Sequence, residues 1–465
     1  MTLVLGIPPS ITSLIQQGLI ERAFHDSLFP SLLFRAEAQS EEWEANTGVE
    51  LYMTRPGLLA PVTKSTPAGT DPVPQVLSYE QWVARLDRYS GTVDTHMPTS
   101  TVSNSDQFLR NIQQLGMQAG QSLNRIPRNV LYSSYLSGQT NLIAVTASTD
   151  VTLRVASVNG FVDVLVKGTN VRPTPVSSSN PLQITLMNGA TPIVRNVIGV
   201  DLDNPEDPMG PGTLFLSAQV GAIVAVRSPV FSSAKPRVIR AGGGNSVDAI
   251  GSSDISQIQD YLQAASWLRK NNVPAHEDGT YHVHINTDAN EQLFTDPAWQ
   301  RLNQGRGAGE EAYQNGFIGR IYGCSFFLNN ECPEVGNAGS RTLTGTNAAY
   351  SEDIGAETTN EAGVNIGRVL VTGRGALYEK WLNEQAYVSE AGITGKVGEF
   401  QVTNAGVEIK TDNIRLIIRA PLNRLQDMVS TSWSCTTSFA VPSDITTNGV
   451  ERFKRAVVVE HALNS

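Results

Sequence analysis

The spacing of apolar residues at the start of this chain of 465 residues predicts a short helix. Ser10 is an N-cap candidate, and apolar side chains then recur at roughly helical intervals, at Ile11, Leu14, Ile15, Leu19 and Phe24. The following segment, DSLFPSLLF, carries five large apolar side chains but is too short to bury them itself. It therefore packs either on its own domain or along a neighbouring chain, and the sequence leaves both possibilities open.

Residues 46–100 have the pattern of a long hairpin. Two weakly alternating stretches, VELYMTRPGLL and YEQWVARLDRYSG, flank a tip rich in Pro and Gly, TKSTPAGTDPVP. An isolated two-stranded ribbon is only marginally stable in water. We therefore expect this hairpin to be completed by a partner.

The strongest helical pattern follows the hairpin. Ser103 and Ser105 are candidate N-caps, and Pro127 should kink the helix or start a second segment before it ends near Leu136. The apolar face keeps a spacing of three to four residues, at Phe108, Ile112, Leu115, Ala119, Leu123, Ile126 and Val130. A helix this long predicts a spine for the fold.

From Thr140 to Gly243 the chain changes to short stretches with a period of two. Runs such as VTLRVAS and VDVLVKG are separated by the turn signals Asn159-Gly160 and Asn188-Gly189. This pattern predicts a separate all-β sandwich or barrel that closes at the triplet Gly242, Gly243 and Gly244.

The rest of the chain predicts an α/β region and then strands. Ser253 leads a helix with Ile258 and Leu262 on its apolar face, and TYHVHIN, NGFIGRIYGCSFFLNN and RVLVTG form strands. A second helix is expected around Ala376 to Leu382. The last strands, NIRLIIRAP, LQDMVSTSWSCTTSFAVP and RFKRAVVVEH, are expected to pack against the spine helix.

Composition and charge exclude several classes of protein. The net charge of −10 and the absence of basic runs argue against a nucleic-acid binder, because phosphate neutralisation needs clustered Lys and Arg. No stretch is long and apolar enough for a membrane span, and the N-terminus lacks the basic region of a signal peptide. Cys324, Cys332 and Cys435 show no CxxC spacing, which favours buried thiols in a reducing cytoplasm.

Candidate chemical sites are weak. His282 and His284 share one face of a strand, as metal ligands can, but only His276 is close enough in sequence to be a third ligand. We expect this pair on the solvent side of its strand. Asp201, Asp203 and Asp207 could attract calcium, but the loop lacks the spacing of a known calcium site. Adjacent carboxylates such as Glu41-Glu42 and Glu310-Glu311 diverge from each other. We therefore predict no catalytic residue, no cofactor-binding residue, no metal site and no cofactor.

The order of these elements resembles the major capsid proteins of tailed bacteriophages, with their HK97-like fold of N-arm, E-loop, P-domain and A-domain. The stretches YHVHINTDANEQLFTDPAWQRL, NGFIGRIYGCSFFLNN (with Gly316, Gly319 and Gly323) and RVLVTGRGALYEKW are similar to the N4-like branch of that family. The resemblance implies an α+β fold with an added all-β insertion domain. Its expected domains are an N-terminal arm (1–45), an E-loop hairpin (46–102), a P-domain spine helix (103–139), a β insertion (140–243), an A-domain (244–410) and P-domain strands (411–465).

The resemblance implies a structural protein of the virion and not an enzyme. Such a chain assembles in the host cytoplasm, through hexamers and pentamers, into an icosahedral head around double-stranded DNA. Its expected partners are copies of itself, scaffolding and portal proteins, cement or decoration proteins, and DNA held weakly. No membrane is expected among its partners. Because the numbering begins at Met1, we expect no long N-terminal scaffold segment to be removed.

Other readings remain beside this one. Covalent crosslinking between subunits would need Lys64 at the hairpin tip as the donor, and no acceptor matches it. A β-rich adhesin of a cell surface or phage tail is a second function class, and a metal hydrolase using His282 and His284 is a third. The adhesin would need an export signal and several β modules, and the hydrolase would need a bound metal.

Overall fold

The computed structural model divides into two compact units. Unit 1 comprises Met1–Leu51, Val83–Arg128 and Leu377–Ala440, and unit 2 comprises Tyr52–Trp82, Asn129–Ala376 and Val441–Ser465. The residues that the structure describes are 19–28, 33–44, 48–57, 59, 61–72, 74–96, 107–166, 170–205, 207, 209–303, 319–335, 364–382, 396–397, 400–403, 406–411, 414–419, 425, 427–444 and 452–463.

The sheet of unit 1 is built around two long antiparallel strands, β4 (Asp87–His96) and β24 (Met428–Ala440). They pair continuously from Asp87 opposite Thr437 to His96 opposite Met428. The other strands follow the order β1-β19-β24-β23-β22-β21-β20. Their bounds are β1 Ala38–Glu42, β19 Leu377–Trp381, β20 Lys396–Val397, β21 Phe400–Thr403, β22 Gly406–Thr411 and β23 Ile414–Arg419.

The spine helix predicted from the sequence is present as α4 (Gln107–Tyr135), one uninterrupted element that contains Pro127. Its candidate caps Ser103 and Ser105 lie outside the described residues. In unit 1 its apolar face packs with α2 (Leu19–Leu28) and the inner sides of β23 and β24. The buried helix residues are Ile20, Phe24, Phe108, Ile112, Leu115, Ala119 and Leu123. Helical periodicity therefore identified five core-facing residues of α4 correctly, whereas Ile126 and Val130, also predicted on this face, are only half-buried.

Phe34, the last residue of the apolar segment DSLFPSLLF, shows whether that end of the segment packs on its own chain or on a neighbour. It is fully buried, and its backbone N–H donates to Asn124 Oδ1 on α4 at 2.7 Å. Both residues belong to unit 1. Phe34 therefore packs on its own chain, whereas residues 29–32 lie outside the described residues.

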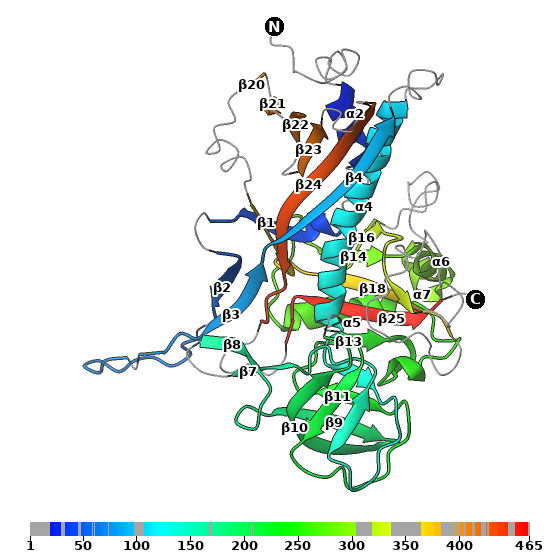
Figure 1. Ribbon diagram of the computed structural model, residues 1–465. Helices are drawn as coiled ribbons and strands as arrows, with labels where there is room; N and C mark the ends of the chain where they lie inside the picture. The colour runs from blue at the N-terminus through cyan, green and yellow to red at the C-terminus, as the bar shows by residue number, and fades with distance from the viewer. Residues whose placement is uncertain are drawn as a thin grey trace. The chain divides into compact units, whose positions relative to one another are not determined.

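The main sheet of unit 2 has the order β13-β25-β18-β14-β16-β15, and β17 (Glu334–Val335) also pairs with β18 (Figure 1). Helices α5 (Ile258–Lys270), α6 (Thr287–Thr295) and α7 (Pro297–Asn303) contribute to a core with one face of this sheet. The strands are β13 Val238–Arg240, β14 Tyr281–Ile285, β15 Arg320–Ile321, β16 Cys324–Leu328, β18 Ile366–Thr372 and β25 Ala456–Ala462.

The predicted β insertion contains a closed six-stranded barrel, with its strands in the order β5-β12-β9-β10-β11-β6. The two end strands meet through a bridge between Leu142 and Val155 and through a hydrogen bond from Ala156 N to Asn141 O. Closure leaves no free edge that could aggregate. The strands are β5 Gln139–Asn141, β6 Thr152–Val155, β9 Leu182–Asn188, β10 Thr191–Leu202, β11 Gly212–Leu216 and β12 Pro229–Ser232.

A smaller sheet joins the hairpin to the insertion, in the order β2-β3-β8-β7. The hairpin strands are β2 (Glu50–Pro56) and β3 (Tyr79–Arg85). Strand β8 (Asn170–Pro175) lies parallel to β3, with Tyr79 opposite Asn170, and pairs on its other side with β7 (Asp163–Val166). The pairing of β3 with β8 was not predicted, because strand pairing depends on residues distant along the chain.

One sequence expectation was wrong. The expected helix at Ala376 to Leu382 is strand β19, which pairs with β1 on one side and β24 on the other. Pairing on both sides overrides the local helix propensity of Ala, Leu, Glu and Lys. Strand β25, for which the sequence indicated no partner strand, pairs with β13 and β18 in the main sheet of unit 2. Residues 377–410 fall in unit 1, and the A-domain bounds of 244–410 stay a prediction.

The strand-rich mixture of helices and sheets nevertheless confirms the predicted α+β class. Among the described residues, no helix is long and apolar enough to cross a membrane.

Candidate functional site

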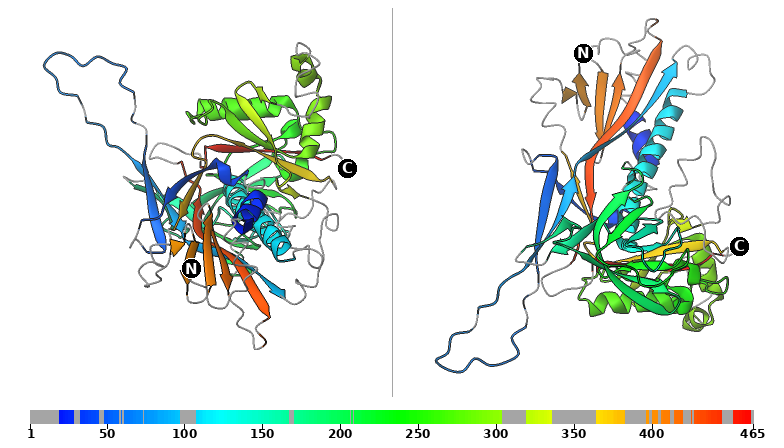
Figure 2. Two further views of the ribbon diagram at one scale, coloured as in Figure 1. Left: turned by 90° about the horizontal axis from the view of Figure 1, so that it is seen from above. Right: turned by 60° about the horizontal axis from the view of Figure 1, so that its bottom comes forward.

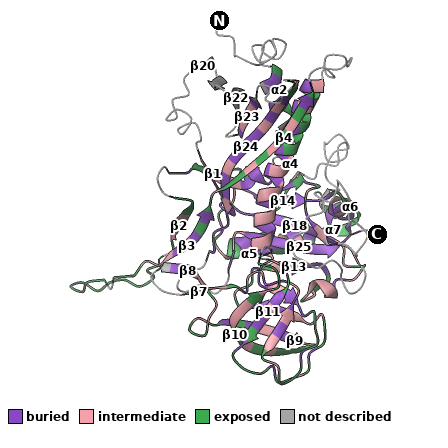
Figure 3. Ribbon diagram, viewed as in Figure 1, coloured by how far each residue is buried: buried purple, intermediate pink, exposed green. Residues whose placement is uncertain are grey.

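The feature of the structure most suited to binding another chain is the hairpin arm, which we define as residues 57–78. Figure 2 shows it as a long loop extending beyond the ends of β2 and β3. Its described residues are almost all exposed (Figure 3). The exposed fraction is 56% for Leu59, 79% for Val62 and 84% for Val76. The arm therefore offers apolar side chains that its own unit does not cover.

Charged residues gather at the base of this arm. Arg55 on β2 forms ion pairs with both Glu80 on β3 and Asp444, which follows β24. Arg455, just before β25, donates from Nε to Asp444 Oδ1 at 2.9 Å, and the hydroxyl of Ser443 donates to Glu80 Oε2 at 3.4 Å. All of these residues lie in unit 2.

The electrostatics of this base are set by burial. Glu80 is only 2% exposed, and desolvation raises its pKa although the cation of Arg55 opposes that shift. The guanidinium carbon of Arg55 also lies 5.6 Å from the centre of the Trp82 ring, and Trp82 is buried. The base is thus an ordered polar cluster, in contrast to the exposed arm beyond it.

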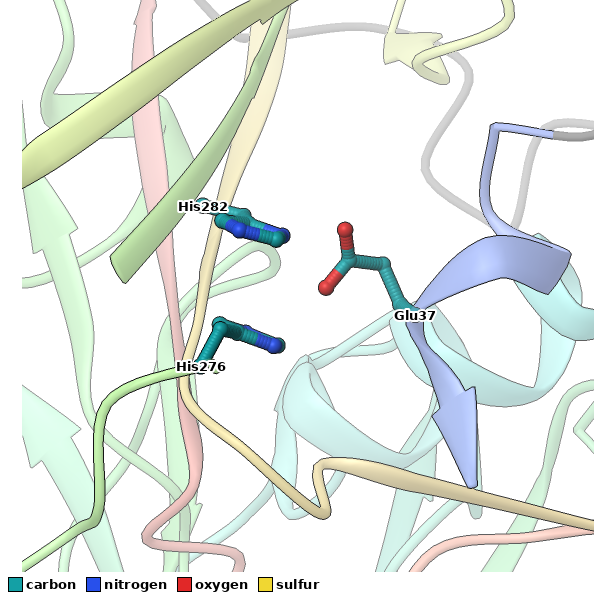
Figure 4. A group of neighbouring side chains, drawn as sticks. All are labelled: Glu37, His276 and His282. Atoms are coloured by element: carbon teal, nitrogen blue, oxygen red, sulfur yellow. The ribbon is translucent and has the colours of Figure 1, made fainter. Parts of the chain in front are cut away.

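The structure pairs the histidines differently from the sequence expectation. The rings of His276 and His282 are stacked, with centroids 3.8 Å apart and planes inclined by 7°. Figure 4 shows them face to face; Glu37, also drawn there, belongs to unit 1. His276 Nε2 is 3.2 Å from the carbonyl oxygen of Thr372, and His282 Nε2 is 3.5 Å from Asp278 Oδ2.

Asp278 organises the turn before β14. Desolvation acts to raise its pKa, but hydrogen bonds from the hydroxyl and backbone N–H of Thr280 outweigh it and hold the pKa at about 2. Ser325 and Arg320 also donate to this carboxylate, at 3.2 and 3.1 Å. These contacts tie the turn to β15 and β16, which is a structural role.

The expectation of a solvent-facing pair was wrong for His284, which is 1% exposed. Its neighbour across the sheet, Leu370 on β18, is also fully buried. On the same sheet, the hydroxyl of Tyr132 in α4 donates to the carbonyl oxygen of Arg368. Both faces of this sheet are therefore covered, so alternation along β14 does not separate core from solvent.

The acidic loop uses its side chains for local structure. Asp203 accepts from both guanidinium Nη atoms of Arg154, at 2.6 and 2.7 Å, and the hydrogen bond from Arg154 lowers its pKa. Asp207 Oδ1 accepts from the backbone N–H of Met209 at 3.2 Å. Asp201 is exposed on β10. Two of the three carboxylates are thus already engaged by partners within the chain.

The cysteines, Lys64 and the adjacent glutamates are the remaining candidate residues from the sequence. Cys324, Cys332 and Cys435 are buried free thiols, as the sequence predicted, and burial raises the pKa of Cys324 to about 11. Lys64 is exposed on the hairpin arm. Glu41 forms an ion pair with Lys380, while Glu310 and Glu311 lie outside the described residues.

One buried ionic cluster was missed by the sequence analysis. Glu460 on β25 accepts hydrogen bonds from Arg240 on β13 and Arg368 on β18, at 2.8 and 3.1 Å. It borders a cavity of about 60 Å³ lined by Ser133, Leu136, Gln139, Thr140, Asn141, Ser157, Asn159, Phe231, Arg240, Ser246, Val247, Arg368 and Glu460. A charge inside an apolar strand such as RAVVVEH was the available signal, because an unpaired buried charge is costly.

The solved structures that are similar to this chain include capsids of phages. No family model and no curated protein matches it. Among solved structures, the capsid of the cyanophage P-SCSP1u has a TM-score of 0.46 at 12% identity, covering 93% of this chain and 89% of that chain. The capsid of Ralstonia phage GP4 gives 0.44 at 12%, with 92% and 88% covered. The capsid of cyanophage Pam1 gives 0.45 at 12%, with 92% and 88% covered.

Proposed function

We propose that this chain is the major capsid protein of a tailed bacteriophage, with an HK97-like fold and a β insertion. It would assemble through hexamers and pentamers into the icosahedral head that encloses double-stranded DNA. Its role is structural and not enzymatic, and its place is the virion. The observation that carries the proposal is the hairpin arm, which extends from unit 2 with its apolar side chains exposed.

The physical argument concerns the free energy of ordering the arm. Fixing each residue costs on the order of 1–2 kcal/mol of conformational entropy, and an isolated ribbon recovers little of it. Leu59, Val62 and Val76 recover nothing while they remain exposed. A neighbouring copy that covers them would supply the missing burial, and obligate interfaces of about 2,000–5,000 Å² are large enough to do so. A repeated contact of one arm with the next copy also suits a shell that closes by symmetry.

The finer parts of the proposal concern partners. We infer assembly in the host cytoplasm with scaffolding and portal proteins, and cement or decoration proteins on the finished shell. The net charge of −10 favours weak contact with the packaged DNA, because strong binding requires clustered cations. A strongly basic inner surface in the assembled particle would contradict this part.

Electron microscopy of the expressed protein, alone and with a candidate scaffolding partner, tests the function. Uniform icosahedral particles are expected. A variant in which residues 59–76 are replaced by a short Gly-rich turn keeps the strands that form the base of the arm, and we expect it to fold without forming shells. A full-length chain that stays monomeric in every condition would overturn the proposal, and an exported monomer that binds a cell surface would favour the adhesin.

A further inference from the structure

The base of the hairpin arm holds four charged residues that pair with one another. Arg55 bridges Glu80 on the opposite hairpin strand and Asp444 on the segment between β24 and β25, and Arg455 completes the set by donating to Asp444. Arg455 also donates from Nη1 to the carbonyl oxygen of Arg374 at 2.6 Å. Two cations and two carboxylates balance, and Arg55 is the member that joins the two strands of the hairpin to the rest of unit 2.

These charges lie far enough inside the unit to matter energetically. The exposed fraction of the side chain is 2% for Glu80 and 7% for Asp444, against 21% for Arg55 and 18% for Arg455. Exposed ion pairs contribute little, whereas removing one partner of a buried pair leaves a charge that must be exposed or neutralised. Without Arg55, the carboxylate of Glu80 would be left in the interior beside that of Asp444.

Asp444 also has an unusual backbone, with a φ of 58° in the left-handed region. Non-glycine residues adopt this region at some cost in energy, although Asp tolerates it better than most. The ion pairs with Arg55 and Arg455 are contacts that can hold Asp444 in this conformation. The segment after β24 is therefore coupled to the hairpin through a backbone turn as well as through charges.

We propose that the four-residue cluster of Arg55, Glu80, Asp444 and Arg455 is a conformational latch that clamps the hairpin base to the C-terminal segment and sets the direction of the arm. When the cluster is closed, β2 and β3 are tied to Asp444; when Arg55 withdraws, both strands lose this tie, while β3 keeps its pairing with β8. The arm can reach roughly 35 Å beyond this point, since an extended chain spans about 3.3 Å per residue. A small change of angle at the latch is therefore magnified at the tip.

The latch is tested by hydrogen exchange, read by mass spectrometry, on the purified full-length chain. Arg55→Met should speed exchange of the backbone amides in β2 and β3 by about tenfold or more, because the loss of a buried partner favours local opening. Amides of the β9–β10 hairpin in the barrel should keep their rates. The matched control is Arg154→Met, which removes an arginine whose pair with Asp203 is exposed, and it should leave β2 and β3 unchanged.

A second substitution separates the charge cluster from simple packing. In Arg55→Met with Glu80→Met, no carboxylate of β3 is left unpaired, so protection of β2 and β3 should largely return. Lost packing of Arg55 on Trp82 would not be rescued in this way. If Arg55→Met fails to fold, Arg55→Lys keeps one charge but lacks the guanidinium fork, and a smaller increase in exchange is expected.

Native exchange rates in β2 and β3 of a folded Arg55→Met chain would overturn the latch. So would faster exchange that the double substitution does not reduce. The readout uses the single chain and needs no particles. Failure of the latch is therefore distinguishable from failure of the proposed shell function.

Discussion

The carboxylate of Glu460 on β25 accepts a hydrogen bond from Nε of Arg240 on β13 at 2.8 Å, with both side chains almost wholly buried. The same carboxylate accepts from Arg368 on β18, so one anion joins three strands of the main sheet of unit 2. Glu460→Gln would leave two buried guanidinium groups without their carboxylate. We expect it to lower the free energy of unfolding by about 3 kcal/mol, measured by urea denaturation.

The control for this prediction is Asp203→Asn, which breaks an arginine–carboxylate pair on the exposed side of the barrel. It should leave the urea midpoint unchanged. Equal effects of the two substitutions would show that burial does not set the strength of these pairs.

The buried imidazole of His461 should make the free energy of unfolding depend on pH below neutrality. Burial lowers its pKa to about 4 from an ordinary value of 6.5, although its contact with the carbonyl oxygen of Ala462 opposes the shift. Because the folded chain resists protonation of His461, the contribution of this residue to the free energy of unfolding is fully present above pH 6.5. It is lost as the pH drops towards 4. The loss amounts to about 3 kcal/mol.

Urea denaturation at pH 7 and pH 4.5 measures this effect. Other groups titrate over the same range, so the useful quantity is the difference between the native chain and His461→Gln. The variant should lose less stability on acidification than the native chain does. Parallel losses in both proteins would refute the assignment to His461.

For Glu80 we expect the opposite dependence of stability on pH. Desolvation raises its pKa above the ordinary 4.5, so its favourable contribution exists below pH 4.5 and is lost as the pH rises through the folded value. The native chain should therefore lose stability relative to Glu80→Gln as the pH rises from 4 to 7, whatever the difference between the two proteins at pH 4. Urea denaturation of both proteins at the two pH values measures this change. An equal difference at pH 4 and pH 7 would contradict the prediction.

Asn124 tests how the segment before β1 is held in unit 1. Its Oδ1 accepts the backbone N–H of buried Phe34 at 2.7 Å, and Asn124→Ala removes this acceptor. We expect a loss of about 1–2 kcal/mol in the free energy of unfolding. Gln113→Ala, on the exposed side of the same helix, is the matched control and should have little effect. An equal loss in both variants would assign the effect to helix propensity.

We expect the β insertion to tolerate an added peptide in an exposed turn but not its own deletion. Removing residues 140–243 would also remove β8, which pairs with β3, and β13, which pairs with β25. We expect that deletion to give insoluble protein. A short peptide inserted after Gly189, whose φ is 60° in the exposed β9–β10 turn, should leave the chain soluble with an unchanged melting temperature. A soluble, native-like deletion variant would show that the insertion is dispensable for the fold.

The sequence by itself determined the elements whose signals are local. The spacing of Phe108, Ile112 and Leu115 fixed the buried face of α4, and a Pro- and Gly-rich tip between alternating stretches marked the hairpin. The buried state of the three cysteines was also predictable from their apolar contexts. These properties depend on neighbours within a few residues.

Only the tertiary structure decided which distant segments pair. Leu377–Trp381 became a strand because β1 and β24 lie on either side of it, and β25 entered the sheet of unit 2 through β13 and β18. His284 is buried because that sheet is covered on both faces. The ion cluster of Arg55, Glu80, Asp444 and Arg455 joins residues up to 400 positions apart along the sequence. Such contacts depend on the summed free energy of the folded chain, which no local pattern contains.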